Sequence, residues 1–286
     1  MKAAFWALGL VMALVFLLIP PTAAATAVTR KSESIDSKGA KTIVADISYG
    51  AGKLTIDPSG MIQPAKLDVM YTEDREDYDL DYHVTEAVGY LTFKNRAQEI
   101  HEVDAEHNKL GLMLSTKYPT ELKLDVGACS AAIDLGGVRL TDLSLSIGAA
   151  SGDIDFSEPN PERMKDFKIE AGAASVGLTN LGNANFDRLK FEGGAGKFDI
   201  DLRGKYTGES YVDLEIGLGT ADLTLPADIP VRITTNDNWF SSVDLNSRKL
   251  EKIDDGLYQS VGFDDAKTRL VIKLEVGMGS IDVHWR

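Results

Sequence analysis

The chain has 286 residues, 44 of them acidic and 30 basic, which gives a formal net charge of −14 at pH 7. This charge argues against nucleic acid as a partner, and against polyanionic polysaccharides and lipids unless a cation bridges. The only cysteine, Cys129, excludes an intrachain disulfide and a multi-thiolate metal site. Its place among small residues predicts a buried side chain.

Residues 1–25 have the pattern of a secretory signal peptide. Lys2 precedes an apolar run of 17 residues, Ala3 to Ile19, and Ala23 to Ala25 offer an A-x-A cleavage site. The run is near the lower length limit for a membrane span, so an uncleaved single N-terminal membrane anchor is the alternative. We expect the rest of the chain to be extracytoplasmic, that is secreted, periplasmic or on the cell surface, with a linker over 26–40.

A short glycine motif then recurs along the chain. The motif glycines are Gly50, Gly127, Gly148, Gly172, Gly194, Gly217 and Gly277. Four successive intervals from Gly127 are 21, 24, 22 and 23 residues. A repeat of about 22 residues is typical of an architecture in which equivalent units stack on one another.

The copies agree column by column when the glycine is numbered zero. Positions −5, −3 and +6 are apolar, position +2 is always small, and apolar and polar residues alternate before each glycine. This pattern predicts a strand, a tight corner and a second strand in each unit. The predicted fold is all-β, a repeat-built, β-solenoid-like stack, although an antiparallel meander of hairpins would give similar columns.

Two outward columns carry opposite charges. Position −4 is often lysine (Lys123, Lys168, Lys190, Lys273), and position −2 is mostly acidic (Asp125, Glu170, Glu192, Glu215, Glu275). Stacked strands with these columns can pair charges across their edges, so the columns indicate a solvated surface and not a site.

Two segments interrupt the repeat. Residues 59–120 contain further strand-like alternation, so we expect an N-terminal β subdomain over 41–121 and the repeat domain over 122–286. The second interruption, 227–268, contains four aromatic residues: Trp239, Phe240, Tyr258 and Phe263. They favour a cap over the last units, with a ligand platform as the alternative.

The stretch FEGGAGKFDI, residues 191–200, is superficially like a phosphate-binding loop. The P-loop pattern G-x-x-x-x-G-K-[ST] would need glycine at Phe191 and a hydroxyl at Phe198. We therefore expect no nucleotide here. The glycines belong to one corner, with Lys197 facing solvent just after it.

Two clusters are candidate metal sites. Asp77, Asp79 and Asp81 share one face of a predicted strand and are calcium candidates, but a regular strand cannot wrap an ion, so a solvated face is favoured. His101 and His107 are six residues apart, which is not zinc-protease spacing. We expect no dedicated metal site and no cofactor.

Acidic residues also form columns after the corner. They are Asp57, Asp134, Asp155 and Asp201 at +7, and Asp153, Asp199, Asp222 and Asp282 at +5. A solvated edge is the favoured interpretation, with a cation-lined surface as the alternative. Because no nucleophile elbow, cysteine–histidine pair or glycosidase acid pair is present, we expect no catalysis.

The run LKLDVGACSAAIDLGGVRLTDLSLSIGAASGDIDF, the segment LYQSVGFDDAK and the ending RLVIKLEVGMGSIDVHWR resemble two related bacterial groups over roughly Lys41 to Arg286. One is the "putative adhesin" domain of unknown function. The other is the toast-rack and C-terminal domain of the cell-wall-active antibiotics response proteins. The resemblance implies an extracytoplasmic stacked β architecture without known chemistry.

Two functions follow from this resemblance. The first is a non-enzymatic binding or adhesion-type module whose partner is a protein or another cell-envelope component. The second is an accessory sensor or regulator of an envelope-stress response, acting through a membrane partner. The sensing members usually carry several membrane helices, whereas this chain has one apolar run, which favours the first.

Overall fold

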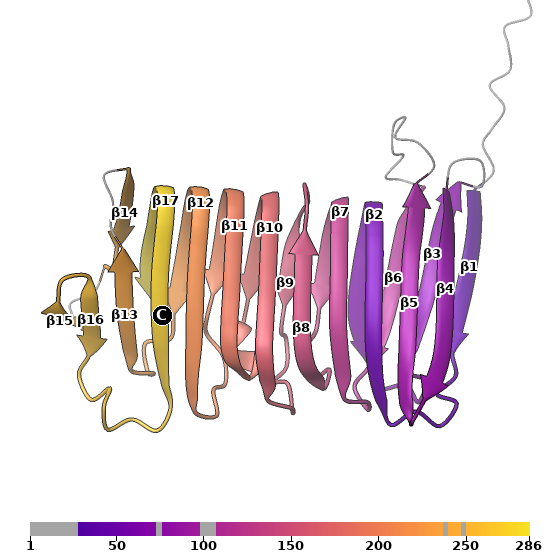
Figure 1. The fold of residues 1–286 in the computed structure, drawn as a ribbon, viewed down its shortest axis with the longest axis horizontal. Helices are drawn as coiled ribbons and strands as arrows, with labels where there is room; N and C mark the ends of the chain where they lie inside the picture. The colour runs from indigo at the N-terminus through magenta and orange to yellow at the C-terminus, as the bar shows by residue number, and fades with distance from the viewer. Residues whose placement is uncertain (1–27, 73–75, 98–106, 237–239, 247–249) are drawn as a thin grey trace, which may run out of the picture.

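The computed structural model describes residues 28–72, 76–97, 107–236, 240–246 and 250–286. Within these ranges, seventeen strands join one sheet and the single helical element is a short 3-10 turn, so the all-β prediction is confirmed (Figure 1). The elements are β1 (Val28–Ile35), β2 (Thr42–Ser59), β3 (Ala65–Thr72), β4 (Glu76–Thr85), β5 (Val88–Ala97), β6 (Lys109–Ser115), β7 (Thr120–Asp134), β8 (Leu140–Ile147), β9 (Ser151–Asp155), β10 (Met164–Thr179), η1 (Leu181–Ala184), β11 (Phe186–Asp201), β12 (Glu209–Leu225), β13 (Val231–Asn236), β14 (Ser241–Asp244), β15 (Leu250–Asp254), β16 (Leu257–Ser260) and β17 (Arg269–Trp285).

Long bent strands build the body of the molecule. β2, β7, β10, β11, β12 and β17 have between 15 and 18 residues each. In Figure 1 each rises on the near face, turns at the upper edge and descends behind. We call this upper edge, formed by the glycine motifs, the corner edge. The two arms of each strand enclose the apolar core between them.

One unit of the stack is divided at its corner. β8 and β9 follow the same path as a long strand but are separated at residues 148–150. Both pair in parallel with β7 on one side and with β10 on the other. Four strands thereby close a small parallel barrel inside the larger sheet.

The predicted columns lie in register. Pairing aligns Ile47, Leu124, Leu145, Ile169, Phe191, Leu214 and Leu274, the whole −3 column. Each of these side chains is at most 1% exposed. Because the long strands pair in parallel, the antiparallel meander is wrong.

The corners explain why position +2 must be small. Gly219 has φ +135°, and a Cβ there would lie 2.0 Å from the carbonyl oxygen of Gly196 in the preceding strand. At Gly279 the corresponding distance to the Gly219 oxygen is 1.7 Å. Side chains cannot occupy these positions without moving the neighbouring backbone. Cys129, Ala150 and Ala174 hold the same column in other coils and are buried, as predicted for Cys129.

The N-terminal strands pair differently from the stack. β1 lies inside the predicted 26–40 linker, which is wrong for those residues, because β1 pairs antiparallel with β3 along its whole length. β3 pairs antiparallel with β6, and β4 with β5, while β5 and β6 pair in parallel with β2. The apolar side chains of both parts belong to one core cluster.

The C-terminal interruption holds both a buried and an exposed aromatic ring. Phe263 is 1% exposed and lies between two guanidinium groups, with ring-centroid distances of 4.3 Å to Arg232 and 5.0 Å to Arg269. Phe240 is 67% exposed, so the predicted cap is wrong for this residue. Tyr258 is half-buried on β16, and Trp239 lies outside the described residues.

Candidate binding groove

A shallow groove of about 810 Å³ runs along the corner edge. Its floor is the glycine column of six successive coils: Gly50, Gly127, Gly148, Gly172, Gly194 and Gly217. Neighbouring strands of a sheet are about 4.8 Å apart, so five such spacings make the groove about 24 Å long. This elongated shape suits a chain-like ligand better than a compact one.

Close stacking of the coils keeps side chains out of the floor. A Cβ on Gly194 would lie 2.8 Å from the carbonyl oxygen of Gly172, and one on Gly277 would lie 2.7 Å from that of Gly217. None of these glycines has a positive φ, so the neighbouring backbone and not the local dihedral angle requires glycine at positions 127, 172, 194 and 217, whereas a Cβ on Gly50 would meet nothing within 4 Å. The groove floor is consequently bare backbone.

Four carboxylates form one wall: Asp125, Glu170, Glu192 and Glu215. Most are neutralised by a lysine two residues earlier in the same strand. The Lys123 Nζ lies 3.0 Å from the Asp125 carboxylate, and Lys168 and Lys190 pair in the same way with Glu170 and Glu192. The hydrogen bond from Lys190 is the main cause of a lowered pKa at Glu192.

The opposite-charge columns therefore pair mainly along each strand, and not across strand edges as the sequence pattern had predicted. Two longer contacts do cross between coils, 3.9 Å from Lys123 to Asp46 and 4.0 Å from Lys168 to Glu192. Glu215 differs because Asp213 takes the lysine position of its strand, and Glu215 is exposed. Glu215 is therefore the one wall carboxylate without a lysine two residues earlier in its own strand.

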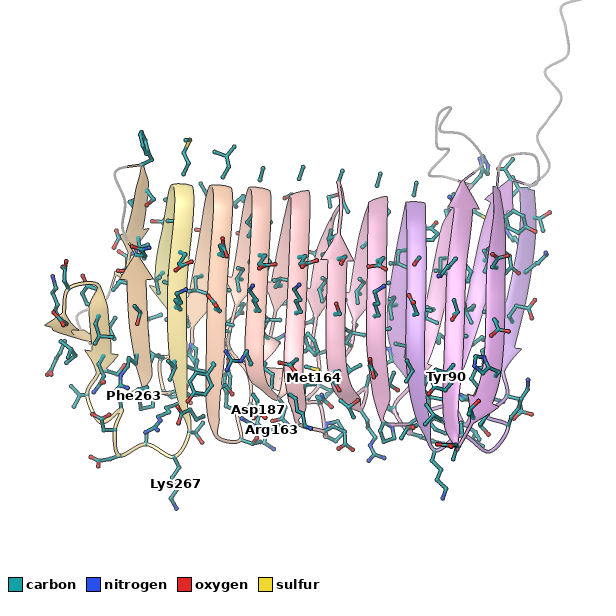
Figure 2. The ribbon with its side chains drawn as sticks, in the orientation of Figure 1. Tyr90, Arg163, Met164, Asp187, Phe263 and Lys267 are labelled. Atoms are coloured by element: carbon teal, nitrogen blue, oxygen red, sulfur yellow. The ribbon has the colours of Figure 1, made fainter. Side chains whose placement is uncertain are left out.

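The lower edge of the stack, opposite the groove, is held by buried and bridging polar groups. Asn160 is 3% exposed, and its Nδ2 donates to the Leu140 oxygen at 2.9 Å and the Ala184 oxygen at 3.1 Å. Figure 2 labels Arg163 and Asp187 at this edge; Arg163 pairs with Asp187 and donates to the backbone oxygen of Glu209 at 2.7 Å. These groups satisfy turn backbone and serve the fold.

The predicted calcium candidates lie on β4, with Asp79 and Asp81 exposed. Asp81 lies 2.9 Å from the His83 imidazole, and Asp79 faces Lys94 across the β4–β5 pair. The side chain of Asp77 and all of His101 lie outside what the structure describes, whereas His107 is described. Among the described residues, no group of three metal-binding side chains comes together.

The +7 carboxylates hold the lower turns. Asp134 accepts hydrogen bonds from the Gly136 amide at 2.8 Å and the Ser157 hydroxyl at 2.6 Å. Asp155 accepts from Thr179 at 2.8 Å and Asn180 at 2.7 Å. The repeat pattern in the sequence did not predict this role. An aspartate whose side chain accepts from the backbone amide two residues later is nevertheless a known turn signal.

The +5 carboxylates form a ladder on the far face. Pairing places Asp199, Asp222 and Asp282 on adjacent strands, and Asp244 of β14, which is not part of the column, pairs with Asp282. Lys197 Nζ lies 3.4 Å from Asp199 and 3.5 Å from Asp222, and it is exposed as predicted. Burial opposes ionisation of Asp222, but hydrogen bonds with His284 and Asp199 and the charge of Lys197 outweigh it and lower its pKa.

Burial raises the pKa of the Cys129 thiol to about 11, so the thiol is protonated at neutral pH and is a poor nucleophile. In the described part of the chain, no helix has the length and apolar character needed to cross a membrane. The apolar run Ala3 to Ile19 lies outside the described residues.

The fold and groove define an all-β protein whose parallel units stack behind a continuous row of glycine corners. The family model for the N-terminal domain of toast_rack (DUF2154) matches residues 24–179, more than half of the chain. The chain belongs to this family, as the sequence resemblance predicted. No curated protein matches the sequence significantly.

Several solved structures are similar to this chain at low sequence identity. A "putative cell adhesion protein" from Clostridium sporogenes is 19% identical, with a TM-score of 0.46 over 91% of this chain and 100% of that one. A "putative adhesin" from Bacteroides fragilis is 10% identical, with a TM-score of 0.40 over 91% and 98%. A "putative lipid binding protein" from Parabacteroides distasonis is 12% identical, with a TM-score of 0.35 over 90% and 96%.

Proposed function

We propose that this protein is a non-enzymatic, extracytoplasmic binding or adhesion-type module of the bacterial cell envelope. The observation that carries the proposal is the groove over six glycine corners, whose floor is backbone and whose wall is acidic. A long, open, preformed surface of this kind suits the docking of an extended partner along the stack.

The chemistry of the groove restricts the partner. The wall carboxylates are hydrogen-bond acceptors, so the matching ligand presents amine, amide or hydroxyl donors along its length. An extended protein segment or another envelope polymer has this character. A polyanion does not, because the wall and the net charge of −14 repel it.

The proposal that the protein is not an enzyme rests on how the carboxylates of the groove wall are paired. Three of the four wall carboxylates are paired with lysine, and the hydrogen bond from Lys190 lowers the pKa of Glu192. A general acid needs a raised pKa, which this pairing opposes. This pairing supports a binding role for the groove in preference to a catalytic one.

We also propose that the stack is β-solenoid-like over 122–286 and carries the N-terminal β subdomain, 41–121, on its first coil. The register of the apolar columns supports the repeat. The antiparallel pairs β1–β3, β3–β6 and β4–β5 support the proposal that the N-terminal strands form a subdomain distinct from the parallel stack.

The second candidate is an accessory sensor or regulator of an envelope-stress response, acting through a membrane partner. The match to the toast-rack family and the apolar run Ala3 to Ile19 favour it. The two functions differ in processing: a retained N-terminal run favours the regulator, and cleavage after Ala25 favours the adhesion-type module.

The test is site-specific photo-crosslinking of the full-length chain in envelopes of the source organism. A crosslinking residue at Glu215, in the groove wall, is compared with one at Glu158, which is exposed in a turn at the lower edge. We expect one envelope component to be captured from position 215 and not from 158, and mass spectrometry of the bait reports whether residues 1–25 are present.

A groove variant sharpens the result. Glu170→Gln combined with Glu192→Gln removes two wall charges and is expected to weaken capture from position 215. Glu158→Gln is the matched control and should leave capture unchanged. Equal capture from both positions, or capture that ignores the groove variant, would contradict the proposed function.

A further inference from the structure

Three large apolar side chains stand on the corner edge at the C-terminal end of the stack. Leu218 is 51% exposed, Met278 52% and Phe240 67%. Leu218 and Met278 occupy position +1 of their corners, where earlier coils carry Ala128, Ala149, Ala173 and Ala195. Figure 2 shows larger side chains above β12, β17 and β14 than above the corners of β7 to β11.

These three side chains are neighbours. Leu218 pairs with Met278 in the β12–β17 register. The Gly279 amide donates to the Phe240 oxygen at 3.2 Å, and Ser241 pairs with Gly279, which places Phe240 beside Met278. We call Leu218, Met278 and Phe240 the apolar tip. Contiguous exposed side chains of this size mark an interaction surface.

The chain enters the fold on the same edge. β1 begins at Val28, which pairs with Thr72, and Met70 of β3 pairs with Lys109 of β6. Lys109 in turn pairs with Lys53, the residue directly after the corner glycine Gly52. Residues 1–27, which contain the apolar run Ala3 to Ile19, are therefore attached at the corner edge, at the end of the stack opposite the apolar tip.

We propose that the corner edge rests on the lipid bilayer in the form that keeps residues 1–25, with the apolar tip inserted at the membrane interface. The bilayer-embedded run holds one end of the edge, and Leu218, Met278 and Phe240 hold the other. Nine strand spacings of about 4.8 Å separate β1 from β17 along the stack, so the two attachments are about 43 Å apart. Attachment at both ends lays the edge flat on the membrane.

A tethered protein needs little intrinsic affinity for this contact. The membrane-embedded run keeps the tip near the bilayer at high effective concentration, so three inserted side chains suffice to hold the orientation. Phe, Leu and Met are suited to the interface because their apolar groups leave water for the acyl-chain boundary.

Charge distinguishes the bilayer from a second copy of the chain. Each copy carries a formal charge of −14, so two copies of the chain repel each other. Thr220 and Ser280, which are neutral, lie at position +3 beside the tip. The surface that fits is a zwitterionic one, and anionic lipid is expected to weaken the contact.

The contact concerns the form that keeps residues 1–25. It turns the groove toward the headgroup layer, since Leu218 of the apolar tip directly follows Gly217 of the groove floor.

The test uses the full-length chain reconstituted in phosphatidylcholine vesicles. An environment-sensitive fluorophore is attached at Met278→Cys or, as the control, at Lys267→Cys, which projects from the lower edge in Figure 2. Buried Cys129, with its raised pKa, stays unlabelled in the folded protein. Replacing the lipid with brominated phosphatidylcholine then quenches a fluorophore only where it meets acyl chains.

We expect emission from position 278 to be blue-shifted and quenched about two-fold or more, with no change at position 267. Leu218→Gln combined with Phe240→Gln should abolish the quenching while the anchored protein stays on the vesicles. Adding phosphatidylglycerol should reduce it.

Absence of quenching at 278, or equal quenching at both positions, would overturn the proposal. So would a blue shift at 278 that grows with protein density without bromine quenching, because that result identifies a second copy as the occupant. None of these readouts involves the groove ligand, so failure here is distinguishable from failure of the proposed function.

Discussion

The stacked coils from β7 to β17 and the N-terminal strands from β1 to β6 restrict their residues by different means. In the stack, a glycine is required by the backbone of the preceding coil: a Cβ on Gly152 would lie 2.1 Å from the Ala131 oxygen. At Gly89, in the N-terminal part, a side chain imposes the requirement instead. A Cβ on Gly89 would lie 2.4 Å from the Tyr82 hydroxyl.

This difference decides what a sequence reveals. Backbone contacts are the same in every coil, so they select the same small residue at the same position and produce visible columns. Side-chain contacts such as the one between Gly89 and Tyr82 occur once. They therefore produce no periodic pattern in the sequence, although they limit the residue at their own position as strongly as the backbone contacts do.

The largest effect is expected at a stacked corner. Gly196→Val places a Cβ 1.8 Å from the Ala174 oxygen, so the two coils must separate or the corner must deform. We expect a loss of roughly 3 kcal/mol of unfolding free energy, at the upper end for overpacking. Urea unfolding followed by circular dichroism measures this loss. Lys197→Ala, one residue on and exposed, is the control and should be near neutral.

A slightly smaller loss is expected at the polar contact that replaces stacking on the first coil. Asn108 is 3% exposed, accepts from the Tyr49 hydroxyl at 3.0 Å and donates to the Ala51 oxygen at 2.6 Å. Asn108→Leu leaves both groups buried without these bonds and should cost about 2 kcal/mol. Tyr49→Phe removes only one of the two bonds and should cost about half as much. Equal costs for the two variants would show that the Asn108–Ala51 bond adds nothing.

Two glycines of one column sharpen the comparison further. A Cβ on Gly277 meets the Gly217 oxygen at 2.7 Å, whereas a Cβ on Gly50 meets nothing within 4 Å. Gly277→Ala should therefore cost about 1 kcal/mol, and Gly50→Ala should be neutral or slightly stabilising through the unfolded chain. Thermal unfolding of the two single variants measures both. A larger loss for Gly50→Ala would mean that the first coil is stacked like the others.

Much of the stack was predictable because its chemistry repeats. The −3 column from Ile47 to Leu274 and the small +2 column were read from the sequence, and pairing puts them in register. The −1 column, which includes buried Val126 and Ile216, was missed because Gly193 and Ala171 interrupt its apolar character.

The candidate groove was not predictable in the same way. Its floor glycines were identified as corners, but alternation along a strand does not report how closely two coils approach. The apolar tip was missed for a related reason. Leu218 and Met278 stand at a position where other coils have alanine, and only the β12–β17 register and the return of the chain at β14 bring Phe240 beside them.

The smallest effect concerns an ion pair across the last two stacked coils. Glu209 accepts from the Tyr211 hydroxyl, at 2.6 Å, and from Arg269, whose guanidinium lies 2.7 Å away, and these partners lower its pKa from the ordinary value of 4.5. A lowered folded-state pKa adds stability that is present above the ordinary value and is lost as pH falls through the folded value.

Glu209→Gln should therefore be less stable than the wild type at neutral pH by about 0.2–1 kcal/mol, as for other solvent-accessible pairs. The difference should vanish as the pH falls below the lowered pKa, because the wild-type carboxyl is then protonated as well. Thermal unfolding of both proteins across the acid range measures this. A difference that persists in acid would assign the effect to packing of the side chain across β12 and β17 and not to its charge.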